Sequence, residues 1–281
     1  MKIGVTLFAT DYAMRPDAFA RACEERGFES VWFPEHTHIP ASLRTPPPYG
    51  GATPRYLWHL HDLFVTLTAA AAATTTIKLG SGICLVVERD PITLAKEVAS
   101  VDQLSNGRLL FGIGAGWNVE EMENHGMPFG RRWKVLRERI EAMKEIWTRD
   151  EAEYHGEFVN FDPIWSYPKP LQQPHPPIIL GTLSARGLNR VANYCDGWIP
   201  VGARIEDIPA AIQDLHAQAR QVGREPSEVP VSIFSAPDDE AVLGRYRDMG
   251  VERAVLGVPS KGADVILPLL DGYAAHVSAF A

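Results

Sequence analysis

Short apolar runs that are typical of β-strands alternate with helical patterns along the whole chain. Within 91–103, for example, Leu94, Val98 and Val101 recur four and three positions apart and form one apolar helix face. The Asn106-Gly107 pair that follows is a typical helix stop. The predicted strands are 3–8, 30–33, 77–85, 108–113, 177–180, 197–200, 229–234 and 254–258, and the predicted helices are 16–26, 61–74, 91–103, 131–147, 185–194, 208–222, 238–249 and 263–277.

This alternation predicts the fold class. Strands that are each followed by a helix favour a parallel sheet. Eight such units within 281 residues predict an α/β fold in which the sheet closes into a (β/α)8 TIM barrel. An open doubly wound sheet is the alternative. We expect a single domain over 1–281.

Two segments interrupt the rhythm, and both are rich in proline and aromatic residues. Loops of this length inside a compact domain are usually functional or disordered, and the aromatic content favours packing. Segment 39–60 follows the second strand and leaves its C-terminal end, which is the catalytic face of such barrels. We therefore predict an insertion that forms a lid over the active site. Segment 151–176 leads from a helix to the next strand, so we expect it on the opposite face in a structural role.

Composition and charge narrow the classes of partner. The net charge is −8 and there is no run of Lys or Arg, which argues against a nucleic-acid partner. No apolar run reaches membrane-spanning length, and the chain enters a strand pattern at once, so we expect a cytoplasmic protein without a membrane partner. The three cysteines, Cys23, Cys84 and Cys195, are far apart, so we expect them to be core residues.

The first candidate for chemistry is Glu35-His36-Thr37-His38, at the end of the second predicted strand. An imidazole there can act as a general acid or base, because its ordinary pKa lies near neutrality. His36 and His38 point to the same side of an extended chain, so metal binding and a purely structural role are alternatives. The later strand ends offer no further metal ligands, so we predict no metal.

Three glycine-rich stretches are further candidates. The stretch 112–117 lacks the last glycine of a dinucleotide fingerprint, where Trp117 stands instead, so we reject a Rossmann site. Glycines there and in 79–83 either let a flat ligand approach the backbone or serve tight packing and bends. In 181–185 a turn of small residues opens a helix, which suits a phosphate with Arg186 as an added charge, or Ser184 is only a helix N-cap.

Taken together, these motifs resemble the luciferase-like monooxygenase superfamily, in its branch that uses the 8-hydroxy-5-deazaflavin coenzyme F420. The matching stretches are 32–40, 79–126 and 174–200. The resemblance implies a barrel, commonly dimeric, with the cofactor ring at its C-terminal mouth and a non-proline cis peptide near Ser81-Gly82. The cofactor-binding residues that we carry over are Ser81, Gly82, Ile83, Gly114, Gly116, Trp117, Asn118 and, as the phosphate loop, Gly181, Thr182, Leu183 and Ser184.

The resemblance also suggests roles beside the ring. It places His36 next to the reactive face, and Glu35 matches an acidic residue of sugar-phosphate-oxidising relatives and would tune or orient His36. Those relatives carry Glu where this chain has Trp117, so we do not expect their sugar-phosphate substrate. Phe8, Tyr56 and Trp58 are predicted to wall the substrate pocket.

We therefore predict an oxidoreductase, a homodimer that transfers hydride between coenzyme F420 and a small organic substrate. One alternative is a monooxygenase that uses reduced FMN. A metal-dependent hydrolase on the same barrel and a cofactor-binding protein without enzymatic activity are the others. Neither the substrate nor the direction of the reaction follows from the sequence.

Overall fold

The computed structural model describes residues 1–281 except 43, 48–49 and 203. Its strands are β1 (Lys2–Leu7), β2 (Ser30–Phe33), β3 (Lys78–Ser81), β4 (Cys84–Leu85), β5 (Leu109–Gly114), β6 (Ala152–His155), β7 (Asn160–Ile164), β8 (Ile178–Leu180), β9 (Gly197–Trp198), β10 (Ser232–Ala236) and β11 (Arg253–Val258). Its α-helices are α1 (Pro16–Glu25), α2 (Leu63–Ala73), α3 (Pro91–Leu104), α4 (Val119–Asn124), α5 (Arg132–Thr148), α6 (Ala185–Tyr194), α7 (Ile208–Gln221), α8 (Glu240–Asp248) and α9 (Ala263–Ala279).

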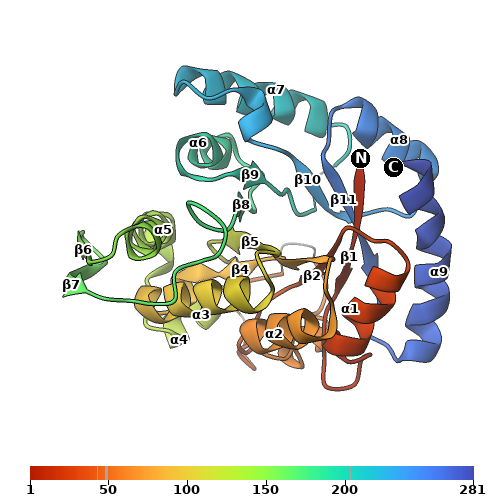
Figure 1. Cartoon of the computed structure of the whole chain (residues 1–281), viewed down its shortest axis with the longest axis horizontal. Helices are drawn as coiled ribbons and strands as arrows, with labels where there is room; N and C mark the ends of the chain where they lie inside the picture. Colours follow the sequence, from red (N-terminus) through yellow and green to blue (C-terminus); the bar gives the residue numbers. More distant parts are fainter. Residues whose placement is uncertain (43, 48–49, 203) are drawn as a thin grey trace.

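The main sheet nearly closes into a barrel with the longer helices around it (Figure 1). Its strands follow the order β10-β11-β1-β2-β3-β5-β8-β9, and all of these neighbours pair in parallel. Parallel bridges between Trp198 and Val231 and between Val201 and Phe234 connect the two edges of that order. The predicted (β/α)8 barrel is confirmed, and the alternative of an open sheet is wrong because its two edges meet.

The third predicted strand, 77–85, is two strands in the structure. β3 pairs with β2 and β5, whereas β4 pairs with β5 through Cys84 and Leu85. The chain bends between them, where the peptide bond from Gly82 to Ile83 is cis. The predicted cis peptide thus lies one bond beyond Ser81-Gly82.

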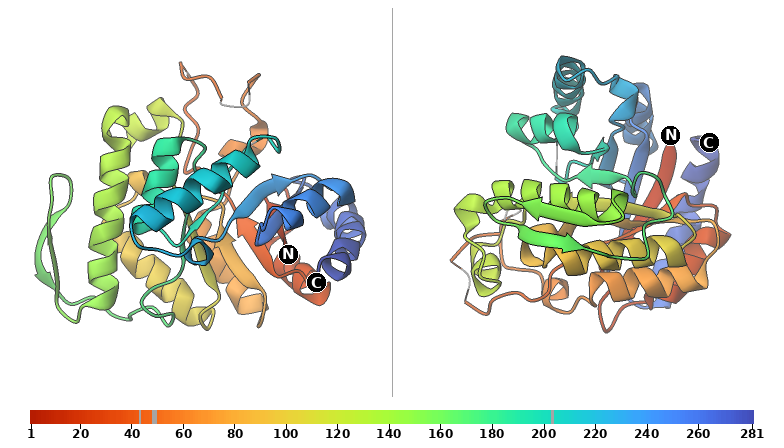
Figure 2. Two further views of the ribbon diagram at one scale, coloured as in Figure 1. Left: turned by 90° about the horizontal axis from the view of Figure 1, so that it is seen from above. Right: turned by 60° about the vertical axis from the view of Figure 1, so that its left-hand side comes forward.

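Two connecting segments contain structure that the pattern did not reveal. Segment 151–176 holds an antiparallel hairpin, β6–β7, which lies outside the barrel beside α5 (Figure 2). The connection after β5 contains the short helix α4, whose N-cap Asn118 accepts a hydrogen bond from the backbone N–H of Glu121. α4 and the segment between β2 and α2 lie at the same end of the molecule (Figure 2).

The bore of the barrel is filled by an aromatic side chain. Trp32 of β2 is completely buried, and a Cβ atom on Gly80 would stand 2.2 Å from its indole ring. Gly80 therefore makes room for Trp32, so at this position tight packing accounts for the glycine. Around it pack Leu110, Ile179, Ile199, Phe234 and Val255, which come from five further strands or their ends.

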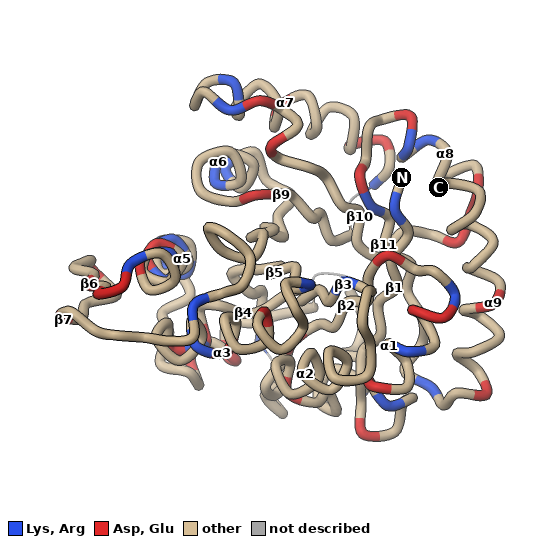
Figure 3. The backbone as a smooth tube through the Cα atoms, in the orientation of Figure 1, with Lys and Arg blue, Asp and Glu red and all other residues tan. Residues whose placement is uncertain are grey.

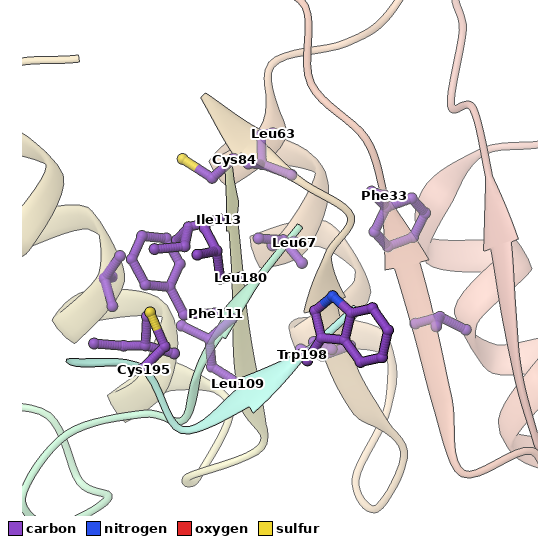
Figure 4. Close-up of a cluster of buried hydrophobic side chains, with 14 of the residues drawn as sticks. Phe33, Leu63, Leu67, Cys84, Leu109, Phe111, Ile113, Leu180, Cys195 and Trp198 are labelled. Atoms are coloured by element: carbon purple, nitrogen blue, oxygen red, sulfur yellow. The ribbon is translucent and has the colours of Figure 1, made fainter. Parts of the chain in front are cut away.

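A second, larger core fills the space between the strands and the surrounding helices (Figure 4). Cys23, Cys84 and Cys195 are free thiols buried in it, as predicted for core residues. In the part of the chain that the structure describes, no helix is both long enough and apolar enough to cross a membrane.

Candidate active site

A buried histidine–carboxylate pair stands at the C-terminal mouth of the barrel. His36 follows β2, and its Nδ1–H donates to Glu121 of α4 at 2.8 Å from Oε2 and 3.0 Å from Oε1. The two side chains are 9% and 1% exposed. With Nδ1 held by the carboxylate, Nε2 is left as the proton acceptor, which is the arrangement of a general base. The edge of the Trp117 ring completes the surroundings, 6.0 Å from the imidazole between centroids.

Glu35 does not orient His36, contrary to the role suggested for it. Its Oε2 accepts from the backbone N–H of Leu85 at 2.6 Å, and its Oε1 accepts from Nε of Arg89 at 2.7 Å. Arg89 also pairs with Asp62 at 2.8 Å and with Glu97 at 3.1 Å. Glu35 therefore ties the end of β2 to β4 and, through Arg89, to the N-cap of α2 and the middle of α3.

Glu88 is a buried carboxyl without a hydrogen-bond partner among the described residues. Its side chain is 1% exposed, and the nearest charged nitrogen in an ion pair is Nε2 of His125 at 3.8 Å. Burial, and after it the nearby carboxylates of Glu121 and Glu35, raise the pKa of Glu88 to about 9. Glu88 is therefore protonated at neutral pH, next to the carboxylate that holds His36.

A chain of polar contacts leads from this region to the surface. Thr37 contacts Nδ1 of His38 at 3.0 Å and Nε2 of His125 at 2.9 Å. Asn124 contacts Nε2 of His38 at 2.8 Å. Burial, followed by the charge of His38, lowers the pKa of His125. His38 therefore faces the end of α4 and does not join His36 in a common ligand set.

The glycines carried over as cofactor contacts come together around one side chain. Ile83 lies directly after the cis bond, and a Cβ atom would stand 1.9 Å from its Cδ1 at Gly114 and 3.2 Å from it at Gly181. Phe234 fills the equivalent place at Gly82. The tips of three strands thus meet as the resemblance implies, but a side chain of the protein occupies the space beside these glycines.

The remaining predicted cofactor contacts differ in whether their polar groups already have a partner within the protein. Gly116 adopts a φ of 68°, which a side chain would strain. The Nδ2 amide of Asn118 is buried with no hydrogen-bond acceptor among the described residues. Ser81, in contrast, donates its hydroxyl to the carbonyl of Gly112 at 2.8 Å, so its oxygen links β3 to β5.

The predicted phosphate loop lies between β8 and α6. Ser184 caps the helix by accepting from the N–H of Gly187 at 3.1 Å, so the N-cap role is real. Thr182 packs on Gly187, where a Cβ atom would stand 1.8 Å from its Oγ1. Leu183 is 57% exposed, and the first amides of any helix have no partner inside it. Gly181 donates its N–H to the carbonyl of Ile113 at 2.8 Å, whereas the first N–H groups of α6 have no acceptor among the described residues.

The predicted lid is tied down at both ends. Arg44 and Thr45 donate backbone N–H groups to Oε1 of Glu120 in α4, at 2.9 and 3.2 Å. At the other end, the N–H of His61 donates to the carbonyl of Ala9 at 2.9 Å, after β1. Positions 43, 48 and 49 of this segment lie outside the described residues.

The three residues predicted to wall the substrate pocket separate into two groups. The rings of Phe8 and Tyr56 lie 4.7 Å apart between centroids, so the structure brings these two together. Trp58 is 48% exposed and contacts His59 instead. In the described part of the chain, no group of three His, Cys, Asp or Glu side chains is arranged to hold a metal ion.

Sequence reasoning missed three residues of this region: Glu121, which holds His36, Glu88, whose pKa is raised by Glu121, and Arg89, which pairs with Glu35. A usable signal existed for the first of these, because Asn118 followed by Glu121 is a capping pattern that opens a helix. The short helix was hidden inside the predicted connection after the glycine-rich strand.

Comparison with known proteins identifies the family. Residues 11–257 match the family described as luciferase-like monooxygenase, and the chain belongs to it. An uncharacterized protein of Mycobacterium tuberculosis is 40% identical over 99% of both chains. The FMNH2-dependent dimethylsulfone monooxygenase of Pseudomonas putida is 30% identical over 66% of this chain and 56% of its own length. The structure of an F420-dependent secondary alcohol dehydrogenase in complex with an F420–acetone adduct superposes with a TM-score of 0.78 at 19% identity, covering 100% of this chain and 99% of that one.

Proposed function

We propose that this chain is an oxidoreductase that transfers hydride between coenzyme F420 and a small organic substrate. The observation that carries the proposal is the buried His36–Glu121 pair, which leaves one imidazole nitrogen as a proton acceptor at the mouth of the barrel. A likeness in fold to an F420-dependent alcohol dehydrogenase supports the choice of cofactor.

The residues at the mouth fit a planar ligand that bears a phosphate. The free N–H groups at the start of α6 suit the phosphate. The buried Nδ2 of Asn118 still needs an acceptor, which a ring carbonyl would provide. Ile83 and Gly116 would then form the surface against which the ring lies, with Trp117 beside it.

The cofactor, when bound, supplies a ring carbon that accepts or donates hydride. The protein supplies the proton transfer. As hydride leaves the substrate carbon, Nε2 of His36 takes the proton of the neighbouring hydroxyl, and in the reverse direction it returns that proton. Glu121 holds the ring by Nδ1–H and offsets the positive charge that develops on it. Because Glu88 is protonated, it adds no second negative charge beside Glu121.

A monooxygenase that uses reduced FMN is the second candidate. The dimethylsulfone monooxygenase at 30% identity favours it, because its name specifies FMNH2. Titration of the purified protein with F420 and with FMN, oxidised and reduced, separates the two. Tight binding of FMN together with no binding of F420 would overturn our proposal in favour of this candidate.

The role of His36 is tested once turnover is seen with a panel of secondary alcohols and their ketones. We expect H36A to lower kcat by about a hundredfold or more and E121Q by about tenfold, with the affinity for the cofactor retained. The exposed variant E151Q is the control and should turn over like the wild type. Unchanged turnover of H36A would remove His36 from the mechanism. The homodimer stays a prediction, which the mass in solution checks.

A further inference from the structure

A groove with a marked excess of positive charge runs between α5 and α6, on the outside of the barrel. Its volume is about 420 Å³. No acidic residue is among those that line it, which are Trp133, Lys134, Arg137, Arg186, Asn189, Arg190, Asn193 and Tyr194. Lys and Arg positions lie on both of these neighbouring helices (Figure 3). Such a groove is unexpected on a chain whose net charge is −8.

Acidic neighbours neutralise only part of this charge. Arg137 pairs with Glu141 at 2.6 Å, and Lys134 lies 3.6 Å from Glu157. The Arg186 guanidinium makes no hydrogen bond or salt bridge in the part of the chain that the structure describes. Arg190 stacks over the ring of Trp133 at 4.4 Å and donates to a backbone carbonyl, that of Arg186.

Arg132 adds a further cation at the edge of the groove. Its Nε is buried without a partner among the described residues. Burial first, and the positive charge of Arg190 second, lower the pKa of Arg132. These guanidinium groups repel each other, and a bound anion would relieve the repulsion.

The groove begins where the predicted phosphate loop ends. Arg186 lies in the first turn of α6, two residues after its N-cap Ser184. A ligand whose phosphate contacts the loop from Gly181 to Ser184 can therefore continue along α6 past Arg186 and Arg190 without crossing the barrel.

We propose that this groove binds a chain of carboxylates that extends beyond the phosphate of the bound cofactor. The inference rests on the proposed function, because coenzyme F420 carries an oligoglutamate tail after its phosphate, whereas FMN ends at the phosphate. Arginine suits such a ligand, since its planar guanidinium pairs with carboxylates in a bidentate fashion. The groove would then select the deazaflavin over FMN by its tail and not by its ring.

Binding of F420 with several glutamates is compared with binding of the same deazaflavin phosphate without glutamate. At low ionic strength we expect the tail to tighten binding by about tenfold in the wild type. The double variant R186E/R190E should lose that gain and bind both forms equally. The matched control R21E/R220E, which makes the same charge change at exposed positions of α1 and α7, should keep it.

A second measurement tests the groove without the deazaflavin ring of the cofactor. Tri-γ-glutamate is titrated into the wild type while the indole resonance of Trp133, assigned with W133F, is followed by NMR. The resonance should shift in the wild type and in R21E/R220E, and stay still in R186E/R190E.

The outcomes separate the two proposals. If F420 binds with the same affinity with and without its tail, the groove proposal is wrong and the function stands. If neither deazaflavin binds, the proposed function fails, and the Trp133 titration alone decides whether the groove binds carboxylates. A shift that R186E/R190E retains overturns the groove proposal in every case.

Discussion

The two ends of the barrel differ in whether their buried polar groups have hydrogen-bond partners. At the N-terminal end, Arg253 is 3% exposed and donates from Nε and a terminal nitrogen to the two oxygens of Glu29, both at 2.7 Å. At the C-terminal end, Glu88 is buried with neither oxygen hydrogen-bonded among the described residues, and the Nδ2 of Asn118 is in the same condition.

The difference distinguishes stability from function. A matched buried pair holds elements together, whereas an unmatched buried polar group costs stability because it has lost its water. The cavity of about 240 Å³ at the N-terminal end is lined by charges of both signs, including Lys78, Asp196 and Glu252. Glu88 and Asn118, in contrast, lie unmatched at the C-terminal end, which supports the mouth there as the working end.

The largest expected effect is the loss of the matched pair. Replacing Arg253 by Met leaves the mostly buried Glu29 without its hydrogen-bonded cation and with only the weaker influence of Lys78, which should lower the free energy of unfolding by about 4 kcal/mol. Burial alone would raise the pKa of Glu29, but the hydrogen bonds and charge of Arg253 bring it below the ordinary 4.5. The stabilisation that the pair gives the wild type should therefore be complete above pH 4.5 and be lost as the pH falls through the lowered pKa, so wild type and variant should converge at acidic pH.

Urea unfolding at pH 7 and at acidic pH measures both parts of this prediction. K2M is the control, because Lys2 forms an exposed pair with Glu252. The loss of this surface pair should lower the free energy of unfolding by only about 0.5 kcal/mol. If R253M and K2M lost the same free energy of unfolding, the buried pair would be no more stabilising than the surface pair, and the prediction would be wrong.

The second effect concerns Glu88 at the C-terminal end, where the substitution should raise the free energy of unfolding as the pH rises. Above pH 4.5 the unfolded chain releases the proton of Glu88, whereas the folded chain keeps it up to about pH 9. Wild-type stability therefore falls across this range, and E88Q removes that fall. We expect the advantage of E88Q in the free energy of unfolding to grow by about 2 to 3 kcal/mol between pH 5 and pH 7.

Chemical unfolding of wild type and E88Q at the two pH values gives the comparison. The exposed variant E151Q provides the baseline for a Glu-to-Gln change. An advantage that does not change with pH would mean that Glu88 is ionised in the fold, and the contrast between the two ends would be lost.

The smallest of the three effects concerns the packing between the ends. Gly80→Ala drives a Cβ atom to 2.2 Å from the indole of Trp32, which should cost about 2 kcal/mol. Gly257→Ala in β11 is the matched control, because the nearest atom to its Cβ would be 4.0 Å away. Thermal unfolding of the two variants measures the difference, and equal melting temperatures would show that Trp32 yields freely.

Most of the fold followed from the sequence because each unit carries its own local signal. Helix α3, for instance, has its apolar face, its first-turn proline and a stop at Asn106-Gly107, where Asn106 adopts a φ of 57°. The break within 77–85 was not predicted, because its glycines fit a close ligand approach or tight packing as well as a break, although the resemblance implied a cis peptide there. The hairpin β6–β7 was hidden by a composition that is typical of loops.

The site followed from the sequence only in part, because its contacts join distant positions. His36 was a candidate from its place after a strand, but its partner Glu121 is 85 residues away. Glu35 stands next to His36 in the chain, yet neighbours in an extended segment point to opposite sides, and Glu35 turns to Arg89. The groove depends on how α5 and α6 lie together, which no local pattern reveals.

The indole of Trp32 also has a kinetic consequence. Because it blocks the barrel from inside, every ligand of the C-terminal mouth has to arrive and depart through one opening. If the proposed reaction takes place at this mouth, the molecule that lies deeper must enter first and leave last. Steady-state kinetics should then report a compulsory order of binding.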